Sequence, residues 1–275
     1  MSLSLDKPER LLRRGAGPGA RLRWPFRRST TISLLSVLVF LALWQMVPAL
    51  GLMNVRYTSQ PSEVATAFVE MLGEAPFYGH AWVSLREFVL GFALALALAV
   101  PCGVALGTSR YVRLVVDPPL MALYIAPPLV LLPILTIWLG IDMASKVAVV
   151  FLGAFFPVAV NTAAGMREAD PRLVRAARSF GAGRLAVFSR VLVPGALPSI
   201  LMGVRLAVGR GVLSVVVAEL FVARAGIGHL LHVYGSALRM DRLLVCALVV
   251  SAFGYGLTQV VRRLEERVAI WRADS

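Results

Sequence analysis

The chain has 275 residues, of which 58% are hydrophobic and only 16% are charged, whereas soluble chains average about 45–50% apolar and about 25% charged residues. This composition excludes a disordered or disulfide-stapled protein and argues against a soluble globular one. The net charge of +13 would indicate nucleic-acid binding in a soluble protein. Here the basic residues lie in blocks between apolar stretches, which is typical of membrane topology. We therefore expect a membrane protein with no nucleic-acid partner.

Six apolar stretches are long enough to span a membrane, since a spanning helix needs about 20 mostly apolar residues. The stretches are continuous rather than alternating, which predicts α-helices and not a β-barrel. The predicted spans are residues 31–50, 86–107, 119–140, 146–164, 197–222 and 243–261. We therefore expect an all-α membrane protein, with a transmembrane domain over 31–262, a flexible basic tail at 1–30 and a second tail at 263–275.

The distribution of Lys and Arg predicts how these spans are oriented. Twenty of these residues fall in one set of segments, namely both tails and the loops 108–118 and 165–196, and five fall in the opposite set. Basic residues are enriched on the cytoplasmic side of membrane proteins. We therefore expect a multi-pass protein with both termini in the cytoplasm. The first apolar stretch reaches spanning length and no clean cleavage site follows it, which favours an uncleaved span over a signal peptide.

The third predicted span is rich in proline. It and the residue before it contain Pro118, Pro119, Pro127, Pro128 and Pro133. Each proline removes an amide donor and clashes with the preceding helical turn. In lipid the freed carbonyls need other partners or must line a cavity. We therefore predict a broken helix beside a translocation pathway, with Pro128 and Pro133 as pathway residues. A kinked packing helix is the alternative.

The fifth predicted span carries three charged residues, Arg205, Arg210 and Glu219. A charge at mid-bilayer costs roughly 2.5–3.5 kcal/mol on insertion scales, so each needs a partner, water or an interface. Helical geometry places both arginines too far from Glu219 to pair with it, and Arg205 lies near enough to the cytoplasmic end to reach the interface. We place Arg210 and Glu219 on the pathway, where Arg210 would attract an anion. A structural arginine that bonds backbone carbonyls of the broken third span is the alternative.

The segment 165–196 predicts two short amphipathic helices on the cytoplasmic side. Asp170 and Pro171 are typical of a helix N-cap and first turn, and Gly181 would end that helix. The second helix would present apolar residues on one face: Leu185, Phe188 and Leu192. Two exposed apolar faces need a cover, which a cytoplasmic partner protein or lipid headgroups would supply.

The same segment resembles the "EAA" loop of the integral membrane subunits of bacterial ABC importers. The resemblance depends on Arg175-Ala176-Ala177, followed by Gly181, Pro194 and Pro198. Arg175 departs from the family pattern, which has Glu at this position. Further matching motifs follow the family order: Ile125–Pro128, Trp138–Gly140, Phe155–Pro157, Asn161–Gly165, Gly203–Leu206, Val217–Glu219 and Ala225–Gly228. Together they make residues 58–272 similar to the taurine, nitrate and alkanesulfonate type of permease.

The resemblance implies a type I importer in the bacterial inner membrane. A homodimer of permease subunits, in contact with membrane lipid, would work with a cytoplasmic ABC ATPase pair and an extracytoplasmic substrate-binding protein. It would carry a small, anionic solute such as a sulfonate, taurine or nitrate. The residues that would couple the permease to the ATPase are Arg175, Ala176, Ala177, Phe180, Gly181, Leu185, Phe188, Pro194 and Pro198.

The chain contains no G-x-x-x-x-G-K-[ST] loop. We therefore expect it not to be an enzyme. ATP and Mg²⁺ would bind the partner ATPase, and this chain would hold no cofactor and no metal.

Two other classes of protein are the competing interpretations. A membrane enzyme would need clustered nucleophiles or metal ligands, but His229 and His232 have no carboxylate or cysteine beside them. Cys102 and Cys246 lie far apart in apolar stretches, as packed side chains do. A stand-alone secondary transporter or channel is the alternative function, and the amphipathic cytoplasmic loop argues against it.

Overall fold

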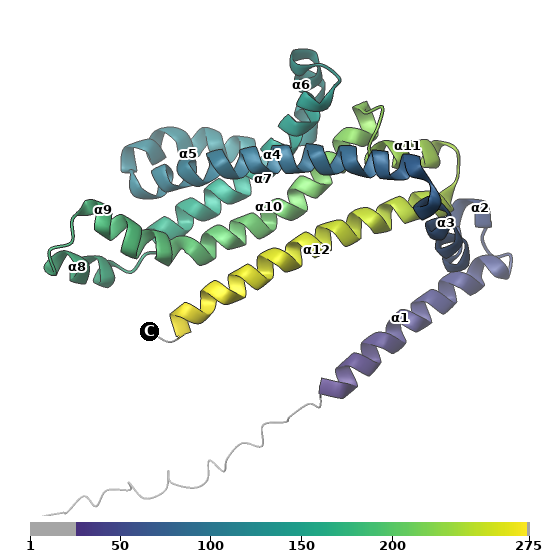
Figure 1. Cartoon of the computed structure of the whole chain (residues 1–275), viewed down its shortest axis with the longest axis horizontal. Helices are drawn as coiled ribbons and strands as arrows, with labels where there is room; N and C mark the ends of the chain where they lie inside the picture. The colour runs from purple at the N-terminus through teal and green to yellow at the C-terminus, as the bar shows by residue number, and fades with distance from the viewer. Residues whose placement is uncertain (1–25, 274–275) are drawn as a thin grey trace, which may run out of the picture.

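The computed structural model describes residues 26–273, with side chains for residues 31–267, and all its regular elements in this range are helices (Figure 1). Most of the predicted basic tail, residues 1–25, and the last two residues lie outside the described residues. Five helices are long and apolar enough to cross a membrane, and a bent helix pair is a sixth candidate. These helices confirm the predicted all-α membrane fold.

Five continuous helices correspond to five of the six predicted spans. They are α1 (Phe26–Ala49), α4 (Ala75–Thr108), α7 (Met143–Arg167), α10 (Val193–Val222) and α12 (Met240–Ala273). Each of the 34-residue helices α4 and α12 is about 51 Å long, whereas the hydrocarbon core of a bilayer is about 30 Å thick. The length of the apolar stretch alone therefore underestimates the length of these helices, because they continue into polar sequence beyond the hydrocarbon core of the bilayer.

The third predicted span is not one straight helix. Its parts are α5 (Arg110–Ile125), the 3₁₀ helix η1 (Pro128–Leu131) and α6 (Leu132–Leu139). The two halves meet at an angle of 91°, and α6 stands out from the bundle in Figure 1. The break follows Ala126, where two successive prolines lack amide donors. It confirms the predicted break in this span and locates it at Pro127 and Pro128.

The expectation that residues 108–118 form a loop is wrong. α5 begins at Arg110, and the Ser109 side chain caps it by accepting a hydrogen bond from the Val112 N–H. An N-cap hydroxyl satisfies one of the free donors of the first turn. The short polar stretch therefore makes a tight turn between α4 and α5 instead of a longer loop.

α7 lies at the centre of the bundle, between α4 and α10 (Figure 1). Small residues bring these helices close together, as is typical where lipid leaves no hydrophobic drive for helices to associate. A Cβ added at Gly91 of α4 would lie 2.7 Å from the Val147 carbonyl oxygen, and one at Gly103 would lie 2.6 Å from the Ala159 oxygen. The α4–α7 contact therefore requires glycine at both positions.

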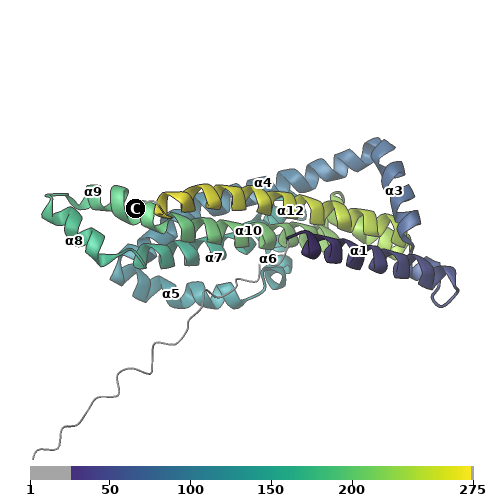
Figure 2. The ribbon, with the colours of Figure 1, turned by 90° about the horizontal axis from the view of Figure 1, so that it is seen from below.

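The outer helices define two ends of the bundle. α12 packs against α10, and both pack against α11 (Ile227–Ser236) at one end, together with α3 (Pro61–Gly73). α8 (Pro171–Ser179), α9 (Arg184–Val187) and the C-terminal end of α12 lie at the opposite end in both views (Figures 1 and 2). We call these the α11 end and the α8 end. α1 contacts the chain through α2 (Val55–Thr58) and α3 at the α11 end, and leaves most of its apolar side chains exposed.

Candidate functional site

The loop with the clearest sequence motif forms a helix that ends in a tight glycine turn. Asp170 caps the first turn of α8, as the sequence predicts. At the other end Gly181 adopts a positive φ of 83°. The Gly181 N–H donates to the Arg178 carbonyl at 2.9 Å, and the Ala182 N–H donates to the Ala177 carbonyl at 3.0 Å. These two bonds form a Schellman motif, which favours glycine at the left-handed position. The prediction that Gly181 ends this helix is confirmed.

The α8 turn exposes large apolar side chains. Phe180 is 91% exposed, Leu185 is 79% exposed and Leu173 is 60% exposed. Fully burying such a side chain contributes about 1.5–3 kcal/mol, so their exposure favours a partner surface. The other predicted coupling residues of α8 are exposed or half-buried: Arg175, Ala176 and Ala177.

The second predicted loop helix is not separate from the bundle. α9 continues through η2, a π-helical turn over Phe188–Leu192, into α10. One continuous helix therefore runs from Arg184 to Val222. The prediction that Phe188 and Leu185 share an uncovered face is wrong. Phe188 is half-buried, because it packs against a cluster formed by Met166 in the last turn of α7 and by Ala196 and Ile200 of α10.

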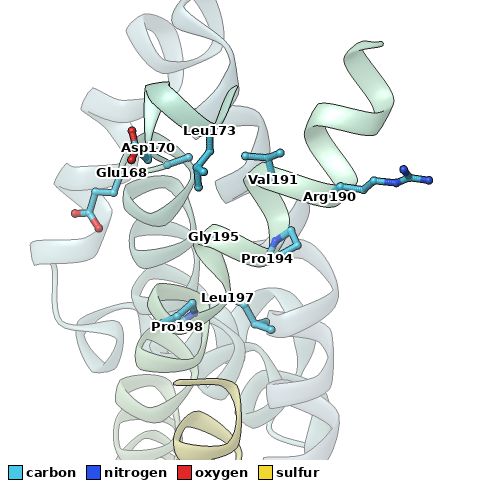
Figure 3. A pocket seen from close by; sticks show the side chains of 10 residues that line it. Glu168, Asp170, Leu173, Arg190, Val191, Pro194, Gly195, Leu197 and Pro198 are labelled. Carbon is cyan, nitrogen blue, oxygen red and sulfur yellow. The ribbon is translucent and has the colours of Figure 1, made fainter. Parts of the chain in front are cut away.

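A groove separates α8 from the start of α10 (Figure 3). Its volume is about 680 Å³, and one of its walls is formed by the first residues of α10. Its lining includes two carboxylates, an arginine and both predicted prolines: Glu168, Asp170, Arg190, Pro194 and Pro198. The fold therefore brings Pro194 and Pro198 to the same surface as α8, as the predicted coupling loop requires.

A buried ion pair near the α11 end was not predicted from the sequence. Lys146 Nζ of α7 lies 2.9 Å from Glu87 Oε1 of α4, and the two side chains are only 7% and 2% exposed. Removing one partner of such a pair leaves an uncompensated buried charge, which costs about 3–5 kcal/mol. The sequence did carry a signal for this pair, because both residues lie within predicted apolar spans, where a charge needs a partner.

Glu219 lies fully buried near the end of α10 and holds the first turn of α11. Its Oε2 accepts a hydrogen bond from the Gly228 N–H at 2.7 Å. The two preceding N–H groups donate to His80 Nδ1 at 3.0 Å and Ser84 Oγ at 2.8 Å, both on α4. Side chains from two helices thus satisfy the free backbone donors at the start of α11. The pathway role of Glu219 stays a prediction.

The two arginines of α10 have different partners, and neither pairs with Glu219, as predicted. Arg205 Nη1 lies 3.2 Å from Glu265 Oε2 on α12. Arg210 is exposed, and its guanidinium carbon lies 4.6 Å from the centroid of the Tyr124 ring on α5, within the range of a cation–π contact. Arg210 therefore does contact the broken third span, through a ring and not through the carbonyls that the structural alternative proposed.

Three of the four predicted pathway residues lie at or near the break in the third span. Pro128 begins η1 and Pro133 lies in the first turn of α6. Arg210 reaches Tyr124, which is two residues before the break. The break also packs against α10 further along, since Leu132 and Ala218 share one buried cluster. The α10 face beside the break is therefore the candidate pathway surface of this chain.

Comparison with known proteins decides the family. Residues 91–270 match the family described as "Binding-protein-dependent transport system inner membrane component". The chain belongs to this family. The taurine transport system permease protein TauC of Escherichia coli (strain K12) is 33% identical over 92% of this chain and 94% of its own length. SsuC of Bacillus subtilis (strain 168), named provisionally as an aliphatic sulfonates transport permease, is 32% identical over 87% of each chain.

The fold of this permease also matches solved transporters. A chain of the MetNI methionine ABC transporter in an inward-facing conformation gives a TM-score of 0.58 at 17% identity, over 70% of this chain and 95% of that chain. The permease is therefore a transport subunit of an ABC importer and not an enzyme. ATP hydrolysis takes place in a separate ATPase subunit, and a binding protein delivers the solute. The stand-alone transporter or channel is not favoured.

Proposed function

We propose that two copies of this permease form the membrane channel of an importer for small sulfonates in the bacterial inner membrane. Two similar relatives are named for taurine and for aliphatic sulfonates transport. The observation that carries the anion assignment is Arg210, because its guanidinium is exposed beside the broken span instead of being neutralised by a carboxylate. A cation within a span is costly unless water or a ligand meets it.

The α8 end is the proposed docking surface for the ATPase pair. The exposed Phe180 and Leu185 would enter an apolar groove on the ATPase, and the turn at Gly181 would set the angle between them. The basic residues of both tails and of the loop 165–196 support a cytoplasmic position for this end, where an ATPase would have access to ATP. ATP-driven closure of the ATPase pair would then move α8 and α10 between two discrete arrangements.

Dependence on the ATPase is the first test of this function. The permease is reconstituted in liposomes with its ATPase pair and a taurine-loaded binding protein, and taurine uptake is measured. Uptake should require the ATPase and ATP. Uptake that proceeds without the ATPase would overturn the assignment and restore the stand-alone transporter.

The anion route is tested in the same assay with Arg210→Gln and Arg210→Lys. Losing the charge should lower sulfonate uptake on the order of tenfold, since a charge-assisted hydrogen bond is worth about 1.5–3 kcal/mol. Lysine keeps the charge and should retain most of the uptake. The thermal stability of both variants should match the parent, since the guanidinium is exposed. Equal loss in both variants, together with a lower melting temperature, would support the structural alternative.

A further inference from the structure

A second cavity with charged walls lies at the α11 end, outside the proposed coupling surface. Its volume is about 650 Å³, and it lies between α4, the turn before α7 and the turn after α10. Its charged lining comes from all three segments: Arg86, Glu87, Asp142, Lys146 and Arg224. Three are cations and two are carboxylates, so the cavity carries one excess positive charge.

The positive charge of the cavity is concentrated on its two arginines. Glu87 neutralises Lys146 through the buried 2.9 Å ion pair. Arg224 is exposed and forms no ion pair or hydrogen bond with the described side chains, residues 31–267. Among the described side chains, the Arg86 guanidinium contacts a partner through its Nε alone, which lies 3.1 Å from the sulfur of Met143. Most donors of both guanidinium groups are therefore available to a ligand, and Asp142 is the remaining carboxylate near them.

The start of α7 adds a further attraction for anions. α7 is a 25-residue helix that begins at Met143, and the Asp142 side chain forms no cap hydrogen bond there. The first N–H groups of a helix and its dipole favour negative charge. Lys146, in the same first turn, is 6% exposed and pairs with Glu87, so the cavity has a buried ion pair in its lining as well as two exposed arginines.

We propose that this cavity binds a tetrahedral oxyanion through Arg86 and Arg224. The planar fork of a guanidinium matches sulfonate and phosphate oxygens in pairs. The cavity lies beyond the end of α10, and Arg210 lies 12 residues before that end, about 18 Å along the helix. The cavity is therefore a binding site separate from the pathway residue Arg210. The choice of a sulfonate as the occupant rests on the proposed function; the phosphate of a lipid headgroup has the same chemistry.

Binding is tested on the complete transporter in nanodiscs of neutral phosphatidylcholine, with ethanesulfonate as the probe. All titrations use the Arg210→Gln background, so that the pathway arginine does not contribute. Calorimetry should show saturable binding, and Arg86→Gln with Arg224→Gln should weaken it on the order of tenfold or more. Arg56→Gln is the matched control, because Arg56 is an exposed arginine at the same end that lines a different cavity. It should leave the affinity unchanged.

A second arm separates a free sulfonate from a lipid headgroup. If phosphatidylglycerol raises the melting temperature of the parent but not of the double variant, and ethanesulfonate does not bind, the occupant is the lipid phosphate. If the double variant fails to fold, the single variant Arg224→Gln replaces it in both titrations. Arg224 lies in an exposed turn and has no partner among the described side chains, so its replacement should leave the fold intact. Equal responses of parent and variants to both probes would overturn the cavity proposal. Loss of ATP-dependent uptake with intact probe binding would speak only against the proposed function.

Discussion

Two turns at opposite ends of the bundle depend on a glycine with positive φ, and they are built in opposite ways. Around Gly181, φ 83°, no atom lies within 4 Å of the position that a Cβ would occupy. Around Gly226, φ 119°, the Glu219 carboxyl group occupies that position. The α11 turn is thus completed by side chains of this chain, whereas the α8 turn is left open. This difference agrees with the proposed docking of an ATPase at the α8 end and with a structural role for the α11 turn.

The largest effect should come from filling the closed turn. Gly226→Ala places a side chain at φ 119° and ψ 165°, a region that is essentially restricted to glycine and costs about 1–3 kcal/mol. The added Cβ also collides with Glu219, and overpacking costs about 1–3 kcal/mol. We expect a loss of about 2–6 kcal/mol in the free energy of unfolding, measured as a lower melting temperature.

Gly79→Ala is the control for the closed turn. Gly79 also lies at the α11 end, within α4, and nothing is within 4 Å of its added Cβ. Its melting temperature should equal or slightly exceed that of the parent, because alanine favours a helix. A Gly226→Ala protein as stable as this control would show that the α11 turn is not closed.

An intermediate effect should come from the open turn, and it should appear in coupling and not in stability. Gly181→Val forces a β-branched residue into a positive φ, which strains the turn by about 1–3 kcal/mol. Since nothing packs on this position, the turn should change shape while the bundle stays folded. We expect ATPase association to be lost in a pull-down, with the melting temperature of the permease close to that of the parent.

Gly183→Val separates strain from bulk in the same turn. Gly183 has a φ of −68° and also has nothing within 4 Å of its added Cβ. This variant adds the same volume without the forbidden backbone, so it should keep the ATPase bound. If both variants bind the ATPase normally, or both lose it, the positive φ is not what sets the docking geometry.

The smallest effect on the fold should come from Phe180→Ala. Phe180 is 91% exposed, so its removal should change the free energy of unfolding by less than about 0.5 kcal/mol. As an anchor in an ATPase groove it should weaken docking by about 1–3 kcal/mol. Tyr111→Ala is the matched control, since Tyr111 is 84% exposed in α5 at the same end. Titration of the ATPase onto both variants measures the difference, and equal affinities would remove Phe180 from the docking surface.

The sequence predicted features that local chemistry decides. The apolar stretches predicted five continuous spans, the prolines predicted the break in the third span, and Gly181 predicted the end of α8. Helical distances also correctly excluded a pairing of Arg205 or Arg210 with Glu219. Each of these depends on residues of a single helix or of the turn next to it, so no knowledge of the tertiary structure was needed.

What the sequence missed depends on contacts between distant segments. Glu87 and Lys146 are 59 residues apart, and only the packing of α4 against α7 brings them together. Phe188 has the right spacing for an exposed face, but a cluster of α7 and α10 residues half-buries it. Likewise, Glu219 accepts a hydrogen bond from the backbone of α11, and no residue type in the sequence indicates such a backbone contact. Burial of a predicted surface residue is decided by its neighbours, and those come from elsewhere in the chain.

The continuous helix from Arg184 to Val222 connects the α8 end of the bundle to the α11 end. Its 39 residues span about 58 Å, with the exposed Leu185 near one tip and Glu219 near the other. If this helix pivots at its midpoint, a tilt of about 5° swings each tip by about 2.5 Å in opposite directions. A hydrogen bond does not survive a displacement of that size. A tilt imposed at the α8 end would therefore release Gly228, move α11 along with the helix, or be absorbed by bending at the π-helical turn or at Pro198.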